Sequence, residues 1–175
     1  MGRTHCGGVP LSTGVQTDMA TPALARFGSD ELRQNYLAPA IAGDMVASIA
    51  VSEPHAGSDV AAIKTTATKD GDDYVINGQK VWNTSADHAD MAILVARTDW
   101  DAVKHQGITY FLLPMRQEGV EVRPLRQMNN HSSFNEVFIT DARVRHDHVV
   151  GEPGKGWTIA LTTLAHERGL SAGLF

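Results

Sequence analysis

The order of apolar and polar positions divides the chain into three parts, and the first, up to about residue 44, is predicted to be helical. Apolar residues recur at helical spacing after Ser29, which is placed to cap a helix, and Gly43 is placed to end it. Pro39 lies inside this pattern and is expected to end or kink the helix, because proline lacks an amide hydrogen. A shorter apolar segment at residues 19–27 predicts a preceding helix.

From about residue 45 to residue 150 the pattern changes to short strands separated by turn residues, a spacing typical of a sandwich or barrel. Asn77-Gly78 predicts a tight hairpin, because a type I′ turn needs positive φ at both central residues. Gly71-Asp72 predicts a turn of the same kind before it. We expect antiparallel strands at residues 45–51, 64–69, 73–77, 79–83, 91–97, 108–114, 120–125, 135–141 and 144–150.

The third part, residues 155–175, returns to a helical period. One face of this helix is predicted to carry the larger apolar residues and one arginine, namely Trp157, Leu161, Leu164, Ala165 and Arg168. A single helix at this position indicates that the chain is a part of something longer. The predicted fold class is therefore α+β with a mainly β core, an antiparallel β-barrel or sandwich domain flanked by helices at both ends.

The composition of the chain excludes several classes of function. The chain has 175 residues, of which 42% are hydrophobic and 20% charged, enough for one domain and a smaller annex. The net charge is −5 and the basic residues are scattered, which argues against a nucleic-acid partner. Cys6 is the single cysteine, so neither an internal disulfide nor a CxxC metal site is expected. The chain shows no targeting pattern and no apolar run of the roughly 20 residues that span a membrane, so we expect a soluble intracellular protein without a membrane span.

Two local motifs do not by themselves indicate a catalytic or binding site. The stretch VVGEPGKGW, residues 149–157, lacks the GxxxxGK[ST] spacing of a phosphate loop and is interpreted as a link into the last helix. No GxGxxG fingerprint occurs either. His146 and His148 alternate at strand spacing, but two histidines without a third ligand favour a pair of surface residues over a metal site, and we expect no metal.

Eight segments, spread in order over almost the whole chain, form a recognisable set: LARFGSDELRQNYLAPAIAGD, VSEPHAGSD, GDDYVINGQKVWNTSADHADMAILVARTD, GITYFLLP, GVEVRPLRQMNN, FNEVFITDARV, VGEPGKGW and LAHERGL. In order and spacing these segments resemble the acyl-CoA dehydrogenase flavoprotein family. The resemblance implies three regions. Residues 1–44 would be the end of an N-terminal helical domain, residues 45–150 a complete middle β-barrel domain, and residues 151–175 the first, truncated helix of a C-terminal helical domain.

The same resemblance implies FAD as cofactor and an acyl-CoA thioester as substrate. Residues implied to bind the cofactor are Val51, Ser52, Gly57, Ser58, Trp82, Asn83 and Thr84, and Ser58 is also implied to contact the CoA arm. Ser52 replaces the usual threonine but keeps the hydroxyl. Asn83 replaces a residue that is usually apolar, and Ser85 replaces the usual asparagine, so details of the pocket differ from the family pattern.

The implied reaction is α,β-desaturation, in which a carboxylate removes the α-proton and the β-hydrogen leaves as hydride to the flavin. Most family members place that carboxylate beyond the part present here, whereas a minority use a glutamate before an arginine on the first helix of the C-terminal domain, which matches residues 151–175. Glu167 before Arg168 fits the second pattern, with Arg168 expected to contact substrate, although a Glu-Arg pair is also an ordinary surface pair.

Partners and alternatives follow from the same resemblance. The chain is expected to form a homo- or hetero-oligomer, to use electron-transfer flavoprotein as electron acceptor, and to lie in the cytoplasm, or in the mitochondrial matrix of a eukaryote. Because it is expected to be only part of an enzyme, the chain alone is expected to be inactive. A non-catalytic half of a split flavoprotein and an acyl-CoA oxidase-like enzyme remain open alternatives, and the acyl chain length is not determined.

Overall fold

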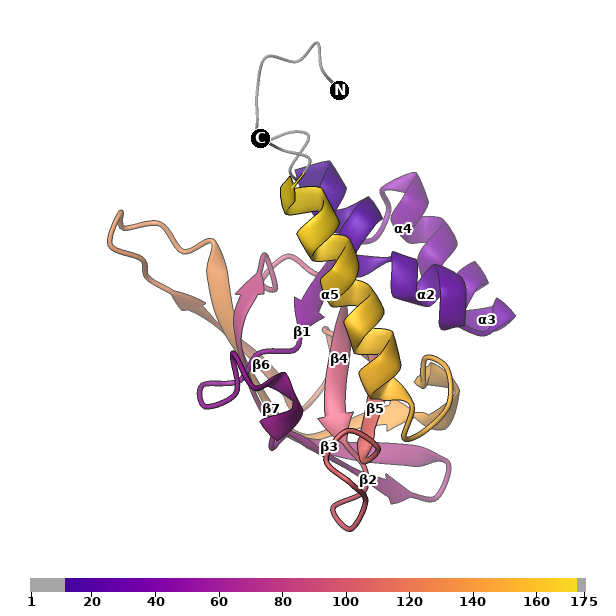
Figure 1. Ribbon diagram of the computed structural model, residues 1–175. Helices are drawn as coiled ribbons and strands as arrows, with labels where there is room; N and C mark the ends of the chain where they lie inside the picture. The colour runs from indigo at the N-terminus through magenta and orange to yellow at the C-terminus, as the bar shows by residue number, and fades with distance from the viewer. Residues whose placement is uncertain (1–11, 173–175) are drawn as a thin grey trace.

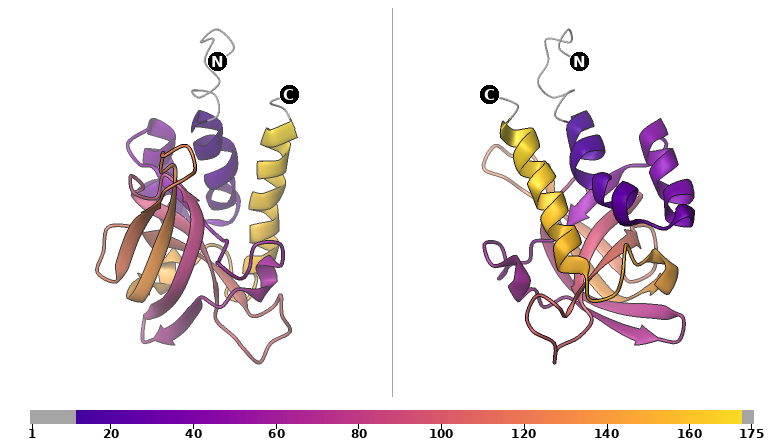
Figure 2. Two further views of the ribbon diagram at one scale, coloured as in Figure 1. Left: turned by 90° about the vertical axis from the view of Figure 1, so that its left-hand side faces the viewer. Right: turned by 45° about the vertical axis from the view of Figure 1, so that its right-hand side comes forward.

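The structure is a computed structural model that describes residues 12–172, with side chains described to residue 169. A seven-stranded sheet curls into a half-barrel, and the helices that precede and follow the strands gather against it (Figure 1). Two further views show these helices side by side along one side of the sheet (Figure 2). The expectation of a mainly β core with helices at both ends is confirmed.

The N-terminal helices follow the predicted capping residues. A π-helix, Val15–Ala20, leads into α2 (Pro22–Phe27), and α3 (Asp30–Leu32) begins where the Ser29 hydroxyl accepts a hydrogen bond from the Leu32 amide. Gly43 ends α4 (Ala38–Ala42) with a φ of 91°, a left-handed conformation that glycine adopts without strain.

Pro39 does not end the helix. A π-helix, Arg33–Leu37, directly precedes α4, and the Ala38 amide bonds to the Arg33 carbonyl five residues back. Pro39 follows as an early residue of α4, where its missing amide hydrogen matters least. The hydrogen-bond pattern therefore changes at the proline, but the helix continues through it.

The strands are β1 (Ala47–Ala50), β2 (Thr66–Asp70), β3 (Asp73–Thr84), β4 (Met91–Arg97), β5 (Ile108–Pro114), β6 (Val120–Leu125) and β7 (Phe134–Arg145). The sheet runs β1-β4-β2-β3-β7-β6, and β5 pairs with β4. The pairs β2–β3, β3–β7, β4–β5 and β6–β7 are antiparallel as expected. The sheet is nevertheless mixed, since β1 and β2 each pair with β4 in parallel.

The hairpin predicted at Asn77-Gly78 is wrong, because β3 runs without a turn through both residues. A shift in register between Ile76 and Gly78 marks an irregularity in the pairing with β7. A Cβ on Gly78 would lie 2.4 Å from the Thr65 hydroxyl oxygen, so this glycine allows a close approach of the neighbouring segment. The turn predicted at Gly71-Asp72 does join β2 to β3.

The strand predicted at residues 144–150 is wrong beyond Arg145. Strand β7 ends there, and His146–His148 forms a 3₁₀ helix in which the Val149 amide bonds to the His146 carbonyl. The two imidazoles therefore do not alternate on a strand face. The turn carries His148 back toward the N-terminal helices.

Strand β4 separates two parts of the hydrophobic core. Met91, Ile93 and Val95 pack with the helices on one face, whereas Ala92, Leu94 and Ala96 pack against the inside of the curled sheet. All seven residues of β4 are buried. A strand covered on both faces has an unbroken apolar sequence, which explains the run MAILVA that precedes Arg97.

Helix α5 (Gly156–Ala172) docks through a different face from the one predicted. Its buried residues are Gly156, Ile159, Ala160 and Thr163, whereas Leu161 is 47% exposed. A Cβ on Gly156 would lie 2.5 Å from the Thr109 carbonyl carbon, so the glycine lets the helix approach β5. Small residues, rather than the larger apolar ones, thus decide which face packs. Within residues 12–172, no helix combines the length and apolar character needed to cross a membrane.

Candidate functional site

A cavity of about 350 Å³ lies where the predicted site residues converge. Its walls come from the Val15–Ala20 helix, β1 with the loop that follows it, the end of β3, the start of β7 and α5. The lining residues are Val15, Met19, Ser48, Ile49, Val51, Ser52, Gly57, Val60, Val81, Trp82, Thr84, Phe134, Leu164 and Glu167. We call this cavity the central pocket.

Two walls of the central pocket are joined directly by hydrogen bonds, although β1 and β3 form no ladder with each other. The Ser48 hydroxyl donates to the Thr84 carbonyl (3.0 Å), and the Val81 amide donates to the Ser52 carbonyl (3.0 Å). Asn83 adds a third bond, from its side-chain amide to the carbonyl of Ile49 (2.6 Å). In two of the three pairs the bonded residues lie more than 30 positions apart in the sequence, and these bonds hold them opposite one another.

Trp82 has an unusual backbone conformation at this junction. Its φ is 64°, a left-handed value that is uncommon for a bulky residue, and the pairing of β3 with β7 is irregular between Lys80 and Asn83. The indole is 61% exposed and packs edge to face with Phe134, with ring centroids 5.9 Å apart. The bulge thus directs a large aromatic surface toward the central pocket.

Six of the predicted site residues line the central pocket together: Val51, Ser52, Gly57, Trp82, Thr84 and Glu167. Glu167 reaches it from α5, one turn after the buried Thr163. Ser58 and Arg168 are exposed and lie outside the lining. Asn83 is fully buried, and its amide faces β1 rather than the pocket.

An ion pair that the sequence pattern did not reveal lies behind the pocket wall. Lys80 is fully buried, and its Nζ donates to Glu53 Oε1 (2.8 Å) and to the Val51 carbonyl (3.1 Å). The one signal for this pair in the sequence was Lys80 itself, a lysine in β3 between the buried Ile76 and Val81.

Burial and charge act in opposite directions on this pair. Burial lowers the pKa of Lys80 to about 8, although the charge of Glu53 opposes that change. Burial alone would raise the pKa of Glu53, but the charge of Lys80 and hydrogen bonds from Lys64, Lys80 and Thr65 outweigh it and lower the pKa. Both groups are therefore charged at neutral pH.

A second, more apolar cavity of about 380 Å³ adjoins the central pocket and shares Val15 and Thr84 with it. Its other lining residues are Ser12, Gln16, Ala40, Gly43, Met45, Val46, Ala47 and Ser85. The Gln16 side chain bridges its walls, since its amide donates to the Met45 carbonyl (2.9 Å) and its carbonyl accepts from the Ala47 amide (3.0 Å).

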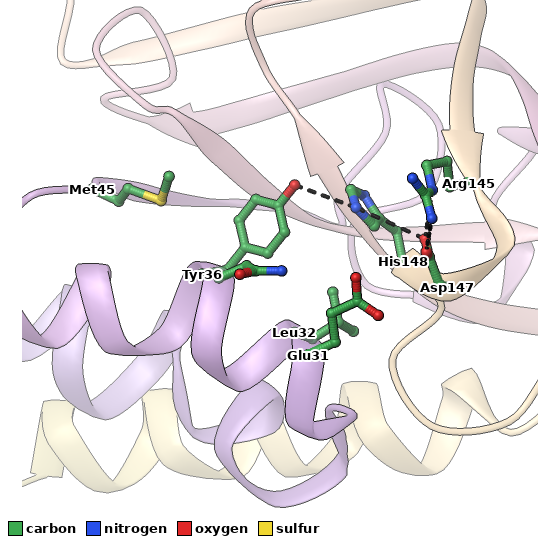
Figure 3. Close-up of a pocket in the computed structure, with 8 residues that line it drawn as sticks. Glu31, Leu32, Tyr36, Met45, Arg145, Asp147 and His148 are labelled. Atoms are coloured by element: carbon green, nitrogen blue, oxygen red, sulfur yellow. Dashed lines mark hydrogen bonds and ion pairs between the residues drawn. The ribbon is translucent and has the colours of Figure 1, made fainter.

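A third cavity, of about 320 Å³, lies between the N-terminal helices and the segment after β7 (Figure 3). Tyr36 points from the helix toward His148, with its hydroxyl 3.3 Å from Nε2, and Arg145 pairs with Asp147. Burial lowers the pKa of His148 despite the opposing charge of Asp147. This cavity contains none of the predicted site residues, and its polar groups largely pair with one another, so the central pocket is the candidate site.

Two family models match the chain. The model described as "Acyl-CoA dehydrogenase, middle domain" matches residues 48–142, and "Acyl-CoA dehydrogenase, N-terminal domain" matches residues 1–44. Acyl-CoA dehydrogenase IpdE1 of Mycobacterium tuberculosis is 42% identical over 154 residues, which cover 88% of this chain and 40% of the relative. The chain thus spans well under half of that relative's length.

Solved structures agree with these matches. The acyl-CoA dehydrogenase from Geobacillus kaustophilus superimposes with a TM-score of 0.89 at 35% identity, covering 94% of this chain and 44% of that protein. The ChsE4-ChsE5 complex from Mycobacterium tuberculosis gives a TM-score of 0.80 at 36% identity, covering 87% of this chain and 39% of the matched one.

Proposed function

The chain belongs to the acyl-CoA dehydrogenase family, and on that premise we propose that its central pocket takes part in FAD-dependent α,β-desaturation of an acyl-CoA thioester. The observation that carries the proposal is the convergence of Ser52, Trp82, Thr84 and Glu167 on one cavity from three separate parts of the chain. The chain covers 40% of the relative IpdE1, so the activity is proposed for the complete protein or complex.

The residues present fit a flavin. The pocket combines a flat exposed indole with hydroxyl groups and aliphatic side chains, a lining suited to an aromatic ring with polar edges. Gly57 adds open space, since a Cβ there would have no neighbour within 4 Å. When bound, FAD would supply the acceptor for the hydrogen and the electron pair that leave the β-carbon of the thioester.

Trp82 would stack against the ring system, and Ser52 and Thr84 would hydrogen-bond its polar atoms. Val51 would contribute an apolar surface beside them. Ser58, which is exposed outside the lining, would contact the CoA arm.

Glu167 would act as the base that removes the α-proton, with Arg168 contacting the substrate from the exposed side of α5. The adjoining apolar cavity that shares Thr84 would receive the acyl chain, because it opens next to the same wall. Hydrogen-bond donors that polarise the thioester carbonyl would be needed to make the α-proton acidic.

A second arrangement is that the chain is one subunit of a hetero-oligomeric flavoprotein. The match to a chain of the ChsE4-ChsE5 complex favours this reading, since that structure holds two different proteins together. Electron-transfer flavoprotein would accept the electrons in either arrangement, within the cytoplasm or a mitochondrial matrix. Native mass spectrometry of the protein isolated from its own cells tests the two arrangements, because a second, different chain in the complex supports the split form.

The test of the flavin site uses tryptophan fluorescence. Trp82 and Trp100 are each 61% exposed, but only Trp82 lines the central pocket, so Trp82→Phe and Trp100→Phe are a matched pair. Titration of the complete protein or complex with FAD should quench the wild type and Trp100→Phe in a saturable manner, and should quench Trp82→Phe far less. Equal quenching of both variants, or no saturation up to about 1 mM FAD, which corresponds to binding weaker than about −4 kcal/mol, would contradict the proposal.

A further inference from the structure

Lys80 and Glu53 lie directly behind the central pocket without lining it. Lys80 precedes Val81 and Trp82 on one wall, and Glu53 follows Val51 and Ser52 on the other. Both charged side chains are buried, with Glu53 only 3% exposed, so neither is available to a ligand or to solvent. Their contacts must therefore act within the chain.

The carboxylate of Glu53 connects its own loop to residues 64–65 and to Lys80 on β3. Oε1 accepts from Lys80, from the Thr65 amide (3.0 Å) and from the Thr65 hydroxyl (2.6 Å). Oε2 accepts from the Lys64 amide (2.7 Å) and lies 3.3 Å from His55 Nε2. Each carboxylate oxygen thus has several partners, as a buried charge requires.

Lys80 connects this cluster to the pocket wall itself. Its second bond goes to the carbonyl of Val51, a lining residue, and the next amide along β3, that of Val81, bonds to the carbonyl of Ser52. The lysine and the adjacent backbone therefore fix two consecutive residues of the loop against two consecutive residues of the strand.

A buried ion pair is a poor means of stabilising a fold, because apolar residues of similar size often stabilise as well or better. Its directed hydrogen bonds, in contrast, define one alignment of the segments that they join. We propose that Lys80 and Glu53 are positioning residues that hold the loop after β1 in register with β3, so that both walls of the central pocket face one ligand. The identity of that ligand as FAD rests on the proposed function.

The test distinguishes a role in aligning the two pocket walls from a role in stabilising the fold. The double variant Glu53→Leu/Lys80→Met replaces the pair with apolar side chains, and Lys104→Met is the control, because Lys104 forms an exposed ion pair with Asp59 beside the same loop. We expect the double variant to unfold cooperatively, at a lower temperature than the wild type because the Lys64 and Thr65 donors lose their acceptor, and to lose tenfold or more in FAD affinity. The control should bind FAD like the wild type.

Amide hydrogen exchange gives a readout that does not depend on FAD. The Val81 amide bonds to Ser52, and neither residue is changed, so its exchange reports the register of the two walls. We expect exchange at Val81 to accelerate at least tenfold in the double variant. If the wild type does not bind FAD, the proposed function fails, but Val81 exchange still tests the positioning role.

Wild-type FAD affinity together with wild-type protection of Val81 in the double variant would overturn the inference. Glu53→Gln/Lys80→Met provides a second variant that keeps a carbonyl oxygen for Thr65 while removing the contact to Val51. Loss of cooperative unfolding in both double variants would also overturn it, because the pair would then be needed for the fold as a whole.

Discussion

The hydroxyl of Tyr110 on β5 lies 2.7 Å from the hydroxyl of Thr163 on α5, and both side chains are fully buried. This hydrogen bond attaches the helix to the sheet one turn before Glu167. The bond fixes the position of α5 relative to the sheet, and thereby the point at which Glu167 reaches the central pocket. Burial also raises the pKa of Tyr110, so the phenol stays protonated and can donate.

We expect Thr163→Val to lower the free energy of unfolding by about 1–3 kcal/mol, because it leaves a buried phenol without its partner. Tyr110→Phe should cost a comparable amount. The double variant should cost less than the sum of the two, since no polar atom is then stranded. Urea denaturation followed by tryptophan fluorescence measures all three, and strictly additive losses would show that the hydroxyl pair is not coupled.

Substitution of Glu167 tests its proposed role as base. In the complete enzyme, Glu167→Gln should lower kcat by about 10²–10⁴-fold, because an amide cannot accept the α-proton, and FAD binding should be retained. Glu152→Gln is the control, since Glu152 is exposed and lies outside the central pocket. Unchanged turnover in Glu167→Gln would assign the base to another residue.

Two glycines of α5 should respond in opposite ways to alanine. A Cβ on Gly156 would lie within 2.7 Å of three backbone atoms of Thr109 and Tyr110, whereas a Cβ on Gly169 would meet nothing within 4 Å. Gly156→Ala should therefore lower the free energy of unfolding by about 1–3 kcal/mol. Gly169→Ala should change it little or raise it by up to about 1 kcal/mol through helix propensity. Denaturation midpoints measure both, and destabilisation by both variants would contradict the packing described for α5.

The partial burial of His148 should make stability depend on pH. The pKa of His148 is lowered below 6.5 in the folded chain by burial, against the opposing charge of Asp147 and the Leu112 backbone, with smaller contributions from Arg145 and Glu31. As the pH falls below about 6.5, the unfolded chain binds a proton that the folded chain does not, so the free energy of unfolding falls.

His148→Gln keeps a polar group near Tyr36 but does not titrate. Between about pH 7.5 and about pH 5, the urea concentration at the midpoint of unfolding should fall more in the wild type than in this variant. An equal fall in both proteins would show that other groups account for the acid sensitivity.

The sequence alone determined features that depend on neighbouring residues. Ser29 and Gly43 marked helix ends because capping uses atoms within a few positions along the chain. The turn between β2 and β3 was predictable at Gly71-Asp72 for the same reason. The resemblance of the segments also indicated the family and six of the residues that meet at the central pocket.

Only the tertiary structure decided features that depend on distant partners. Gly78 has the sequence signature of a turn, but its missing Cβ accommodates Thr65 from another segment. The parallel pairing of β1 with β4 and the docking face of α5 likewise depend on surfaces that are distant in sequence. From the sequence alone, Lys80 would be interpreted as a solvent-exposed cation. In the folded chain, Glu53, which lies 27 positions earlier, pairs with it inside the core. Folding places such groups in a shared environment, and that environment, rather than the local sequence, determines their charge, contacts and role.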